Sequence, residues 1–198
     1  MGQYYNVVLI SGREVLITAR KLKGQGYCMA KLTEHSWFGN HFCDTVGFYL
    51  FKKPRNVIWV GDYAEQEELD HIPCLYERNI KYENIWSEEI RYDKYDELER
   101  HDFDWEGKFI INIDKKEFIN VNHYSNGSVI KVGADDYWIL NPIPILCSVG
   151  NGRGSGDYRG LCMDDVGRWA GDLICISDYK PVEYKELNLA FKEECYCE

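Results

Sequence analysis

The sequence predicts a single α+β domain spanning residues 1–198, in which one long packed helix covers a mainly antiparallel or mixed sheet. Two kinds of pattern predict this class: two pairs of β-rich runs joined by short polar turns, and one apolar run with helical spacing. The chain has 198 residues, of which 45% are hydrophobic, so it can fill the core of one domain.

The two pairs of β-rich runs are predicted β-hairpins. The first joins residues 4–10 to residues 14–18 through a turn that contains Gly12. The second joins residues 108–113 to residues 117–121 through a short charged turn. Glycine and polar residues between two β-rich runs are typical of hairpin turns.

A long helix is predicted over residues 33–53. Thr33 supplies an N-cap side chain, and Pro54 ends the helix because proline cannot continue it. Gly39 and Gly47 fall eight positions apart, on about one face, so another element is expected to pack closely there. The apolar residues at helical spacing are Trp37, Phe38, Phe42, Val46, Tyr49 and Leu50.

Asp62 and Glu65 have the spacing of a capping box, which predicts a short acidic helix that stops at Pro73. Residues 74–106 are polar and rich in tyrosine, and are interpreted as an excursion from the domain. Further strands are expected in several apolar or β-rich runs. These runs are residues 56–60, 128–132, 137–140, 143–149 and 173–177.

The stretch from residue 151 to residue 160 is the strongest functional signal in the chain. It contains four glycines and two arginines, and it follows an apolar run. Glycine backbone can turn its N–H groups inward on an anion, and Arg153 and Arg159 offer fork-shaped donors for a phosphate. Neither a P-loop nor a dinucleotide fingerprint fits the spacing, so a structural surface loop is the alternative interpretation.

The leading hypothesis is therefore a protein that captures a nucleotide or a phosphorylated small molecule at this loop. Trp59, Trp169 or Tyr158 would stack the base, which needs no proton transfer. Asp157 also has a structural alternative, an Asx-turn within its own loop. The predicted ligand-binding residues are Gly152, Arg153, Gly154, Ser155, Gly156, Asp157, Tyr158, Arg159, Trp59 and Trp169.

Catalysis is a weaker hypothesis, and the sequence argues more against an enzyme than for one. Asp62, Asp157 and Asp172 each follow a glycine, and at one sheet edge they would suit a metal-dependent hydrolase. The spacing of His35 and His41 does not place both on one helix face, and no Cys-x-x-Cys pair is present. No catalytic residue, metal ligand or cofactor is therefore assigned.

The net charge of −10 argues against a nucleic-acid partner. It suits a second hypothesis, an acidic inhibitor or immunity-type protein that binds a basic protein of a host through residues 65–106. The acidic residues there are Glu65, Glu67, Glu68, Asp70, Glu88, Glu89, Asp93, Asp96, Glu97 and Glu99. No apolar run reaches membrane-spanning length and no signal peptide is visible, so a cytoplasmic protein with reduced cysteines is expected.

Five segments of the chain share a further pattern. They are residues 1–5, 29–37, 59–64, 150–158 and 167–172. Together these segments resemble a family of uncharacterised proteins from Firmicutes and their phages. The resemblance implies a phage or mobile-element setting, in which a counter-defence role is expected. It supplies no catalytic residue, and it does not cover the tyrosine-rich excursion.

Overall fold

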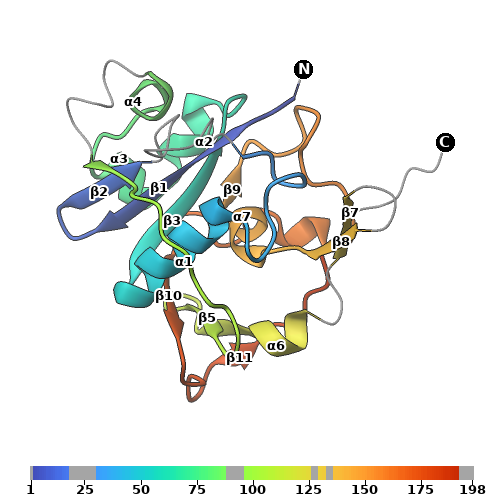
Figure 1. Cartoon of the computed structure of the whole chain (residues 1–198). Helices are drawn as coiled ribbons and strands as arrows, with labels where there is room; N and C mark the ends of the chain where they lie inside the picture. Colours follow the sequence, from blue (N-terminus) through green and yellow to red (C-terminus); the bar gives the residue numbers. More distant parts are fainter. Residues whose placement is uncertain (1, 18–29, 88–95, 126–128, 133–135, 192–198) are drawn as a thin grey trace.

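A nine-stranded mixed sheet forms the centre of the fold in the computed structural model (Figure 1), which describes residues 2–17, 30–87, 96–125, 129–132 and 136–191. The strand order is β11-β6-β5-β10-β3-β1-β2-β4, and β9 pairs with β3 beside this path. The strands are β1 (Tyr5–Ser11), β2 (Glu14–Ile17), β3 (Arg55–Gly61), β4 (Asp96–Glu97), β5 (Phe109–Asn112), β6 (Glu117–Asn120), β9 (Ser148–Val149), β10 (Leu173–Ser177) and β11 (Lys185–Glu186). A separate hairpin pairs β7 (Val129–Val132) with β8 (Asp136–Ile139).

Both predicted hairpins of the central sheet are confirmed. In the first, Ser11 pairs with Glu14 across a turn in which Gly12 has a φ of +58°. In the second, Asn112 pairs with Glu117, and both strands run antiparallel. The β2–β4, β3–β9 and β6–β11 pairs are parallel, so the sheet is mixed as expected.

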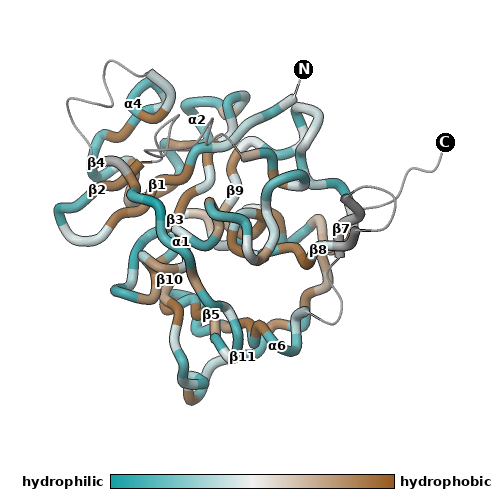
Figure 2. Tube along the Cα trace, in the orientation of Figure 1, coloured by the Kyte–Doolittle hydropathy of each residue, from teal (hydrophilic) through white to brown (hydrophobic). Residues whose placement is uncertain are grey.

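The central strands are buried on both faces, which explains why β1 and β3 are continuous apolar runs rather than alternating ones. On one face, Leu9 and Trp59 join the larger hydrophobic cluster, which also contains Leu50 of α1 (His41–Lys52). On the other face, Val8 and Ile58 join a second cluster. Figure 2 shows these apolar segments at the centre of the trace and hydrophilic segments around them. The sheet and its two clusters form a single α+β domain.

The second cluster is covered by three short helices. They are α2 (Gln66–Asp70), α3 (Pro73–Tyr76) and α4 (Tyr82–Trp86). Leu69, Leu75 and Ile85 point their apolar side chains into this cluster and are fully buried. Of the predicted excursion at 74–106, the part up to residue 87 is thus packed on the sheet, and residues 88–95 lie outside the described residues.

The expected long helix is shorter than residues 33–53. Helix α1 begins after Asn40, whose side chain accepts a hydrogen bond from the backbone of Phe42, and it ends at Lys52 as Pro54 predicts. Residues 32–34 form a turn that is separate from α1, so Thr33 is not the cap. The close approach expected at the glycines occurs at Gly47, where an added Cβ would lie 2.5 Å from the Trp105 ring.

Two further predicted boundaries are wrong. Residues 143–149 form helix α7 (Pro142–Leu146) followed by the short strand β9, because Asn141 caps the backbone of Ile143 and proline suits the first turn. Asp62 does not cap α2. The cap is Glu65, whose backbone N–H donates to Glu68 at 2.8 Å.

Candidate functional site

The glycine loop encloses the carboxylate of its own Asp157. The backbone N–H groups of Gly152, Arg153 and Gly154 all donate to Asp157 Oδ2, at 2.8, 2.7 and 2.8 Å. The loop thus forms the anion-binding nest that its glycines predict. The anion in the nest is a side chain of the chain itself, and these three amides are not free for a ligand phosphate.

The second oxygen of Asp157 is also bound. Tyr5 donates its hydroxyl to Asp157 Oδ1 at 2.7 Å, across 152 residues of sequence. Asp157 is 4% exposed and Tyr5 is fully buried. Burial raises the pKa of the Tyr5 hydroxyl well above its usual range, and the hydrogen bond to Asp157 raises it further. Tyr5 therefore remains a donor at any physiological pH.

The loop is held on both sides by the N-terminal part of the chain. The Gln3 backbone N–H donates to Ser155 O at 2.8 Å, and its side-chain amide donates to Gly150 O at 2.9 Å. On the other side, the Thr33 N–H donates to Gly156 O at 3.3 Å. A Cβ at position 154 would lie 2.6 Å from Gln3 Cβ, so this glycine serves close packing rather than ligand approach.

The two arginines do not form the expected phosphate clamp. Arg153 Nη1 donates to Glu68 Oε2 of α2 at 2.7 Å and to the Tyr63 carbonyl at 2.6 Å. Arg159 is exposed, as is Ser155. Arg153 therefore fastens the loop to α2 through an ion pair.

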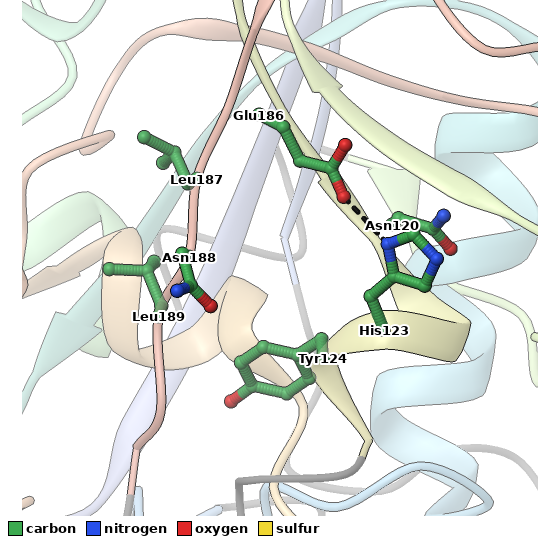
Figure 3. A pocket seen from close by; sticks show the side chains of 7 residues that line it. All are labelled: Asn120, His123, Tyr124, Glu186, Leu187, Asn188 and Leu189. Carbon is green, nitrogen blue, oxygen red and sulfur yellow. Dashed lines mark hydrogen bonds and ion pairs between the residues drawn. The ribbon is translucent and has the colours of Figure 1, made fainter.

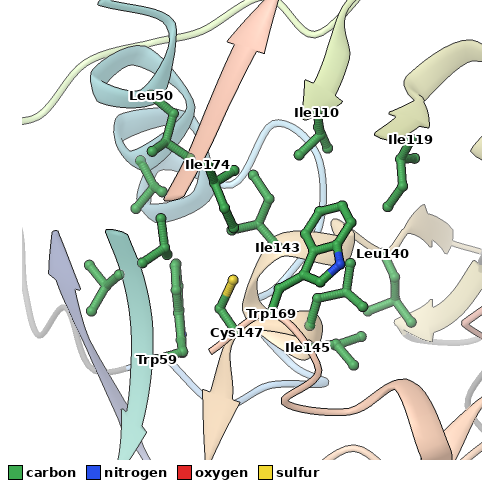
Figure 4. Close-up of a cluster of buried hydrophobic side chains, with 14 of the residues drawn as sticks. Leu50, Trp59, Ile110, Ile119, Leu140, Ile143, Ile145, Cys147, Trp169 and Ile174 are labelled. Carbon is green, nitrogen blue, oxygen red and sulfur yellow. The ribbon is translucent and has the colours of Figure 1, made fainter. Parts of the chain in front are cut away.

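The aromatic side chains expected to stack a base are inside the core. Trp59, Trp169 and Tyr158 are all fully buried, and Figure 4 shows both tryptophans among the aliphatic side chains of the larger cluster. The Trp169 indole donates to Glu117 at 3.1 Å, and the Tyr158 hydroxyl donates to Leu161 O at 2.7 Å. These three side chains are therefore not placed to stack a base at the loop.

The three aspartates proposed for hydrolysis are each used in separate contacts. Asp157 is enclosed by its loop. Asp62 accepts a hydrogen bond from the Tyr4 backbone at 3.1 Å, and burial raises the pKa of its carboxyl. Asp172 is bound by Asn112 and Lys115. Across the described residues, no group of three His, Cys, Asp or Glu side chains is placed to hold a metal ion.

One partly enclosed cavity of about 290 Å³ lies between α6 (Val121–Tyr124) and the chain around β11 (Figure 3). His123 Nδ1 lies 2.9 Å from Glu186 Oε1 at its edge, and this contact keeps the pKa of Glu186 below its usual value. In Figure 3 the other ring nitrogen of His123 points away from Tyr124 and Asn188. This pair therefore connects β11 to α6 and does not direct a base into the cavity.

A more open groove of about 490 Å³ lies beside the start of the glycine loop. We call it the α2 groove. Its lining comes from α2 and the start of α3, from β9, and from the 3₁₀ turn η1 (Met163–Asp165) and the residues after it. Its lining residues are Glu68, Ile72, Ser148, Val149, Gly150, Asn151, Met163, Val166, Gly167 and Ala170.

Two polar side chains that line the α2 groove, Ser148 and Asn151, are bound to the chain itself. Ser148 Oγ donates to Ile145 O at 3.0 Å, and the Asn151 amide binds both the N–H and the C=O of Tyr158. Met163 is 44% exposed and its neighbour Leu161 is 50% exposed. Two large apolar side chains lie two positions apart in a polar loop of the sequence. The prediction of the ligand-binding residues did not include them.

Residues 65–77, which we call the α2–α3 arm, form an acidic surface next to this groove. Glu65, Glu67, Asp70 and Glu77 are exposed, and Tyr76 is 70% exposed. The arm itself contains no lysine or arginine, Arg78 follows it directly, and Arg153 of the glycine loop pairs with Glu68. Of the acidic residues predicted to form an interaction face, Glu88, Glu89 and Asp93 lie outside the described residues.

Comparison with protein-family models, with curated proteins and with solved structures finds no match in any of the three. Among the helices of the described residues, none is long and apolar enough to cross a membrane.

Proposed function

We propose that this protein is a cytoplasmic inhibitor or immunity-type factor that binds a basic surface of another protein through the α2–α3 arm. The observation that carries the proposal is Tyr76, a 70% exposed aromatic residue next to exposed carboxylates on one small helical unit. Tyrosine is enriched among residues that dominate binding energy at protein interfaces. The carboxylates would steer a cationic partner towards it.

The arm is well suited to present such a surface because its buried side holds it in place. Leu69, Ile72 and Leu75 anchor it in the second hydrophobic cluster, and Glu68 fixes its first turn by accepting from Glu65 N–H. The exposed side chains are thereby displayed on a backbone that is already ordered, which lowers the entropy cost of association. The free thiols of the five cysteines in the described residues suit the reducing environment of the cytoplasm.

The nucleotide hypothesis receives less support from the geometry. The three amides of the glycine loop are bound to Asp157, and Arg153 is bound to Glu68. A ligand phosphate would have to displace a buried carboxylate that also accepts from Tyr5. Calorimetry with a panel of nucleotides tests this hypothesis directly, and we expect no binding heat.

The proposal is tested by reversing charge on the arm. A triple variant, Glu67→Lys with Asp70→Lys and Glu77→Lys, is compared with wild type in affinity capture from a lysate of the organism that encodes the protein. We expect a partner that wild type retains at low salt and releases at high salt, and that the triple variant and Tyr76→Ala fail to retain.

A matched control separates the position of the charges from the net charge. Asp102→Lys with Glu106→Lys and Glu183→Lys makes the same change in charge at exposed residues outside the arm. This control should retain the partner as wild type does. Equal loss of the partner in both triple variants would show a general charge effect and reject the arm as the binding surface.

A further inference from the structure

We propose that the cavity between α6 and the chain around β11 binds a small uncharged polyhydroxy compound, a monosaccharide or a cyclic polyol of similar size. We call it the α6 cavity. Its lining comes from Asn120, from His123 and Tyr124 of α6, and from residues 186–189. None of these residues belongs to the α2–α3 arm, so the inference is independent of the proposed function.

The walls of the α6 cavity are fixed parts of the fold. On one side lie α6 and its cap, and on the other side the chain runs on from β11 (Figure 3). Leu187 and Leu189 belong to the larger hydrophobic cluster, and the Leu187 N–H donates to Phe118 O of β6 at 2.8 Å. A cavity whose walls are already ordered binds a ligand without the entropy cost of ordering a loop.

The size of the α6 cavity limits its ligand to a small molecule. Its volume is about 290 Å³. Ligand pockets usually range from about 300 to about 1,000 Å³, so this cavity lies at the lower end of that range. A single sugar ring fits such a volume, whereas a dinucleotide or a peptide of several residues does not.

The lining combines apolar and hydrogen-bonding groups, as a sugar requires. A pyranose ring has apolar C–H groups on its faces and hydroxyl groups, which both donate and accept, around its edge. Leu187, Leu189 and the ring of Tyr124 supply apolar surface, and Asn188 presents its amide beside them (Figure 3). One face of the ligand can therefore pack on carbon while its edge reaches a side-chain amide.

The two asparagines offer hydrogen bonds that the protein does not use itself. The side-chain oxygen of Asn120 accepts from the Asn122 N–H at 3.1 Å, and its NH₂ group donates to nothing else among the described residues. Within the same part of the chain, the exposed side chain of Asn188 has no hydrogen-bond partner. An amide has both a donor and an acceptor, so Asn188 can bind two neighbouring hydroxyl groups of one sugar.

The charges at the α6 cavity favour an uncharged ligand. The Glu186 carboxylate lies 2.9 Å from His123 Nδ1 and 3.4 Å from Lys180 Nζ, so a cationic ligand would compete with both partners. An anionic ligand would meet this carboxylate, and no lysine or arginine is among the described residues that line the cavity. A hydroxyl group can donate to Glu186 without displacing either partner, because a carboxylate accepts several hydrogen bonds.

The test is a ligand titration of the full, isotopically labelled chain, followed by its amide NMR spectrum. The probes are glucose, galactose, mannose, N-acetylglucosamine, ribose and myo-inositol, with inorganic phosphate and methylammonium as the charged alternatives. We expect at least one uncharged probe to shift the resonances of residues 120–124 and 186–189 until they saturate. Saturable shifts there with the charged probes alone, shifts confined to other residues, or no saturable shift with any probe would overturn the inference.

Asn188→Ala tests the side chain that we expect to bind the hydroxyl groups. Its dissociation constant for the best probe should be about tenfold higher than that of wild type, the effect of losing one or two hydrogen bonds. Asn79→Ala is the matched control, because Asn79 is also exposed and does not line the cavity. This control should bind the probe as wild type does, and both variants should keep the amide spectrum of the folded chain. Equal dissociation constants for the two variants would also overturn the inference.

Discussion

Asp157 takes up the hydrogen-bond donors that make residues 151–160 look like an anion site. Its two oxygens accept from three loop amides and from Tyr5, so one buried carboxylate joins the loop to β1. A charged acceptor with several good donors is stabilised in a protein interior, but each donor becomes costly if the acceptor is removed. We therefore expect this residue to control the stability of the loop.

Replacing Asp157 with alanine should strongly destabilise the protein. Three amides and the Tyr5 hydroxyl would lose their acceptor, and each buried unsatisfied group costs about 1–3 kcal/mol, so the total loss should be at least ~3 kcal/mol. Tyr5→Phe leaves only one Asp157 oxygen without its donor and should cost about 1–3 kcal/mol, less than Asp157→Ala. Urea unfolding followed by fluorescence measures both. A loss of stability in Asp157→Ala no larger than in Tyr5→Phe would contradict the account of the loop.

Residue-level sequence reasoning identified the nest but not what fills it. Glycine spacing is local information, and it predicted inward-facing amides. The donor from Tyr5 is 152 positions away, and the partner of Arg153 lies on α2, 85 positions away. The residue spacing of the loop gives no sign of either pairing. From the sequence alone, the inward-facing amides are therefore explained equally well by a ligand phosphate and by an internal carboxylate.

At the scale of elements, local signals predicted most strands and failed at three helix starts, those of α1, α2 and α7. The two hairpins and the strands β3 and β10 follow from β-rich runs beside turn residues. Helix α1 was placed too early because Trp37 and Phe38 continue the apolar spacing, although they pack on the larger cluster from a turn before the helix. Helix α7 was predicted as a strand because the apolar run outweighed the helix-start signal of the Asn141 cap and the proline after it.

Glu14 connects three elements near the end of α1. It lies 2.6 Å from Lys53 at the end of that helix and 2.9 Å from Arg55 at the start of β3, while Glu14 itself begins β2. The Arg55 side chain is 3% exposed, so this carboxylate faces a nearly buried charge. The hydrogen bond from Lys53, together with Arg55, lowers the pKa of Glu14 below its usual value.

This contact should make the protein sensitive to acid. Because the folded pKa of Glu14 is lower than the unfolded value of about 4.3, its contribution to stability is present above that pH and is lost as pH falls through the folded pKa. Glu14→Gln should therefore be less stable than wild type at pH 7, with a difference that shrinks between about pH 4.3 and pH 3. Denaturant unfolding at a series of pH values measures this. A difference that stays constant across the series would contradict the assignment.

For the whole molecule, the α2 groove shows why the candidate site was harder to predict than the fold. Its walls come from residues 68–72, 148–151 and 163–170, which the sheet brings together by placing β9 beside β3. None of these segments carries a sequence motif that indicates a binding site by itself. Only the long-range order of the strands turns an acidic helix, a short strand and a 3₁₀ turn into one surface.

The segment after β11 closes the larger cluster from the far end of the chain. Leu187 and Leu189 are nearly buried, and Phe191 is fully buried with its ring 5.4 Å from that of Tyr158. Tyr158 directly follows Asp157, so this segment packs against the end of the glycine loop. The beginning and the end of the described chain thus meet around one loop.

Phe191→Ala should accordingly destabilise the whole domain rather than only its last segment. Removing a fully buried phenylalanine leaves a cavity against Tyr158 and Tyr124, which typically costs about 3–5 kcal/mol. Val182→Ala is the control: its side chain is 83% exposed, and its effect should stay within about 0.5 kcal/mol. Urea unfolding measures both, and hydrogen exchange at the amides of Gly152 and Gly154 reports the loop. Exchange there should accelerate with Phe191→Ala because the loop and the segment share one core; unchanged protection would mean that the loop is held by Tyr5 and Gln3 alone.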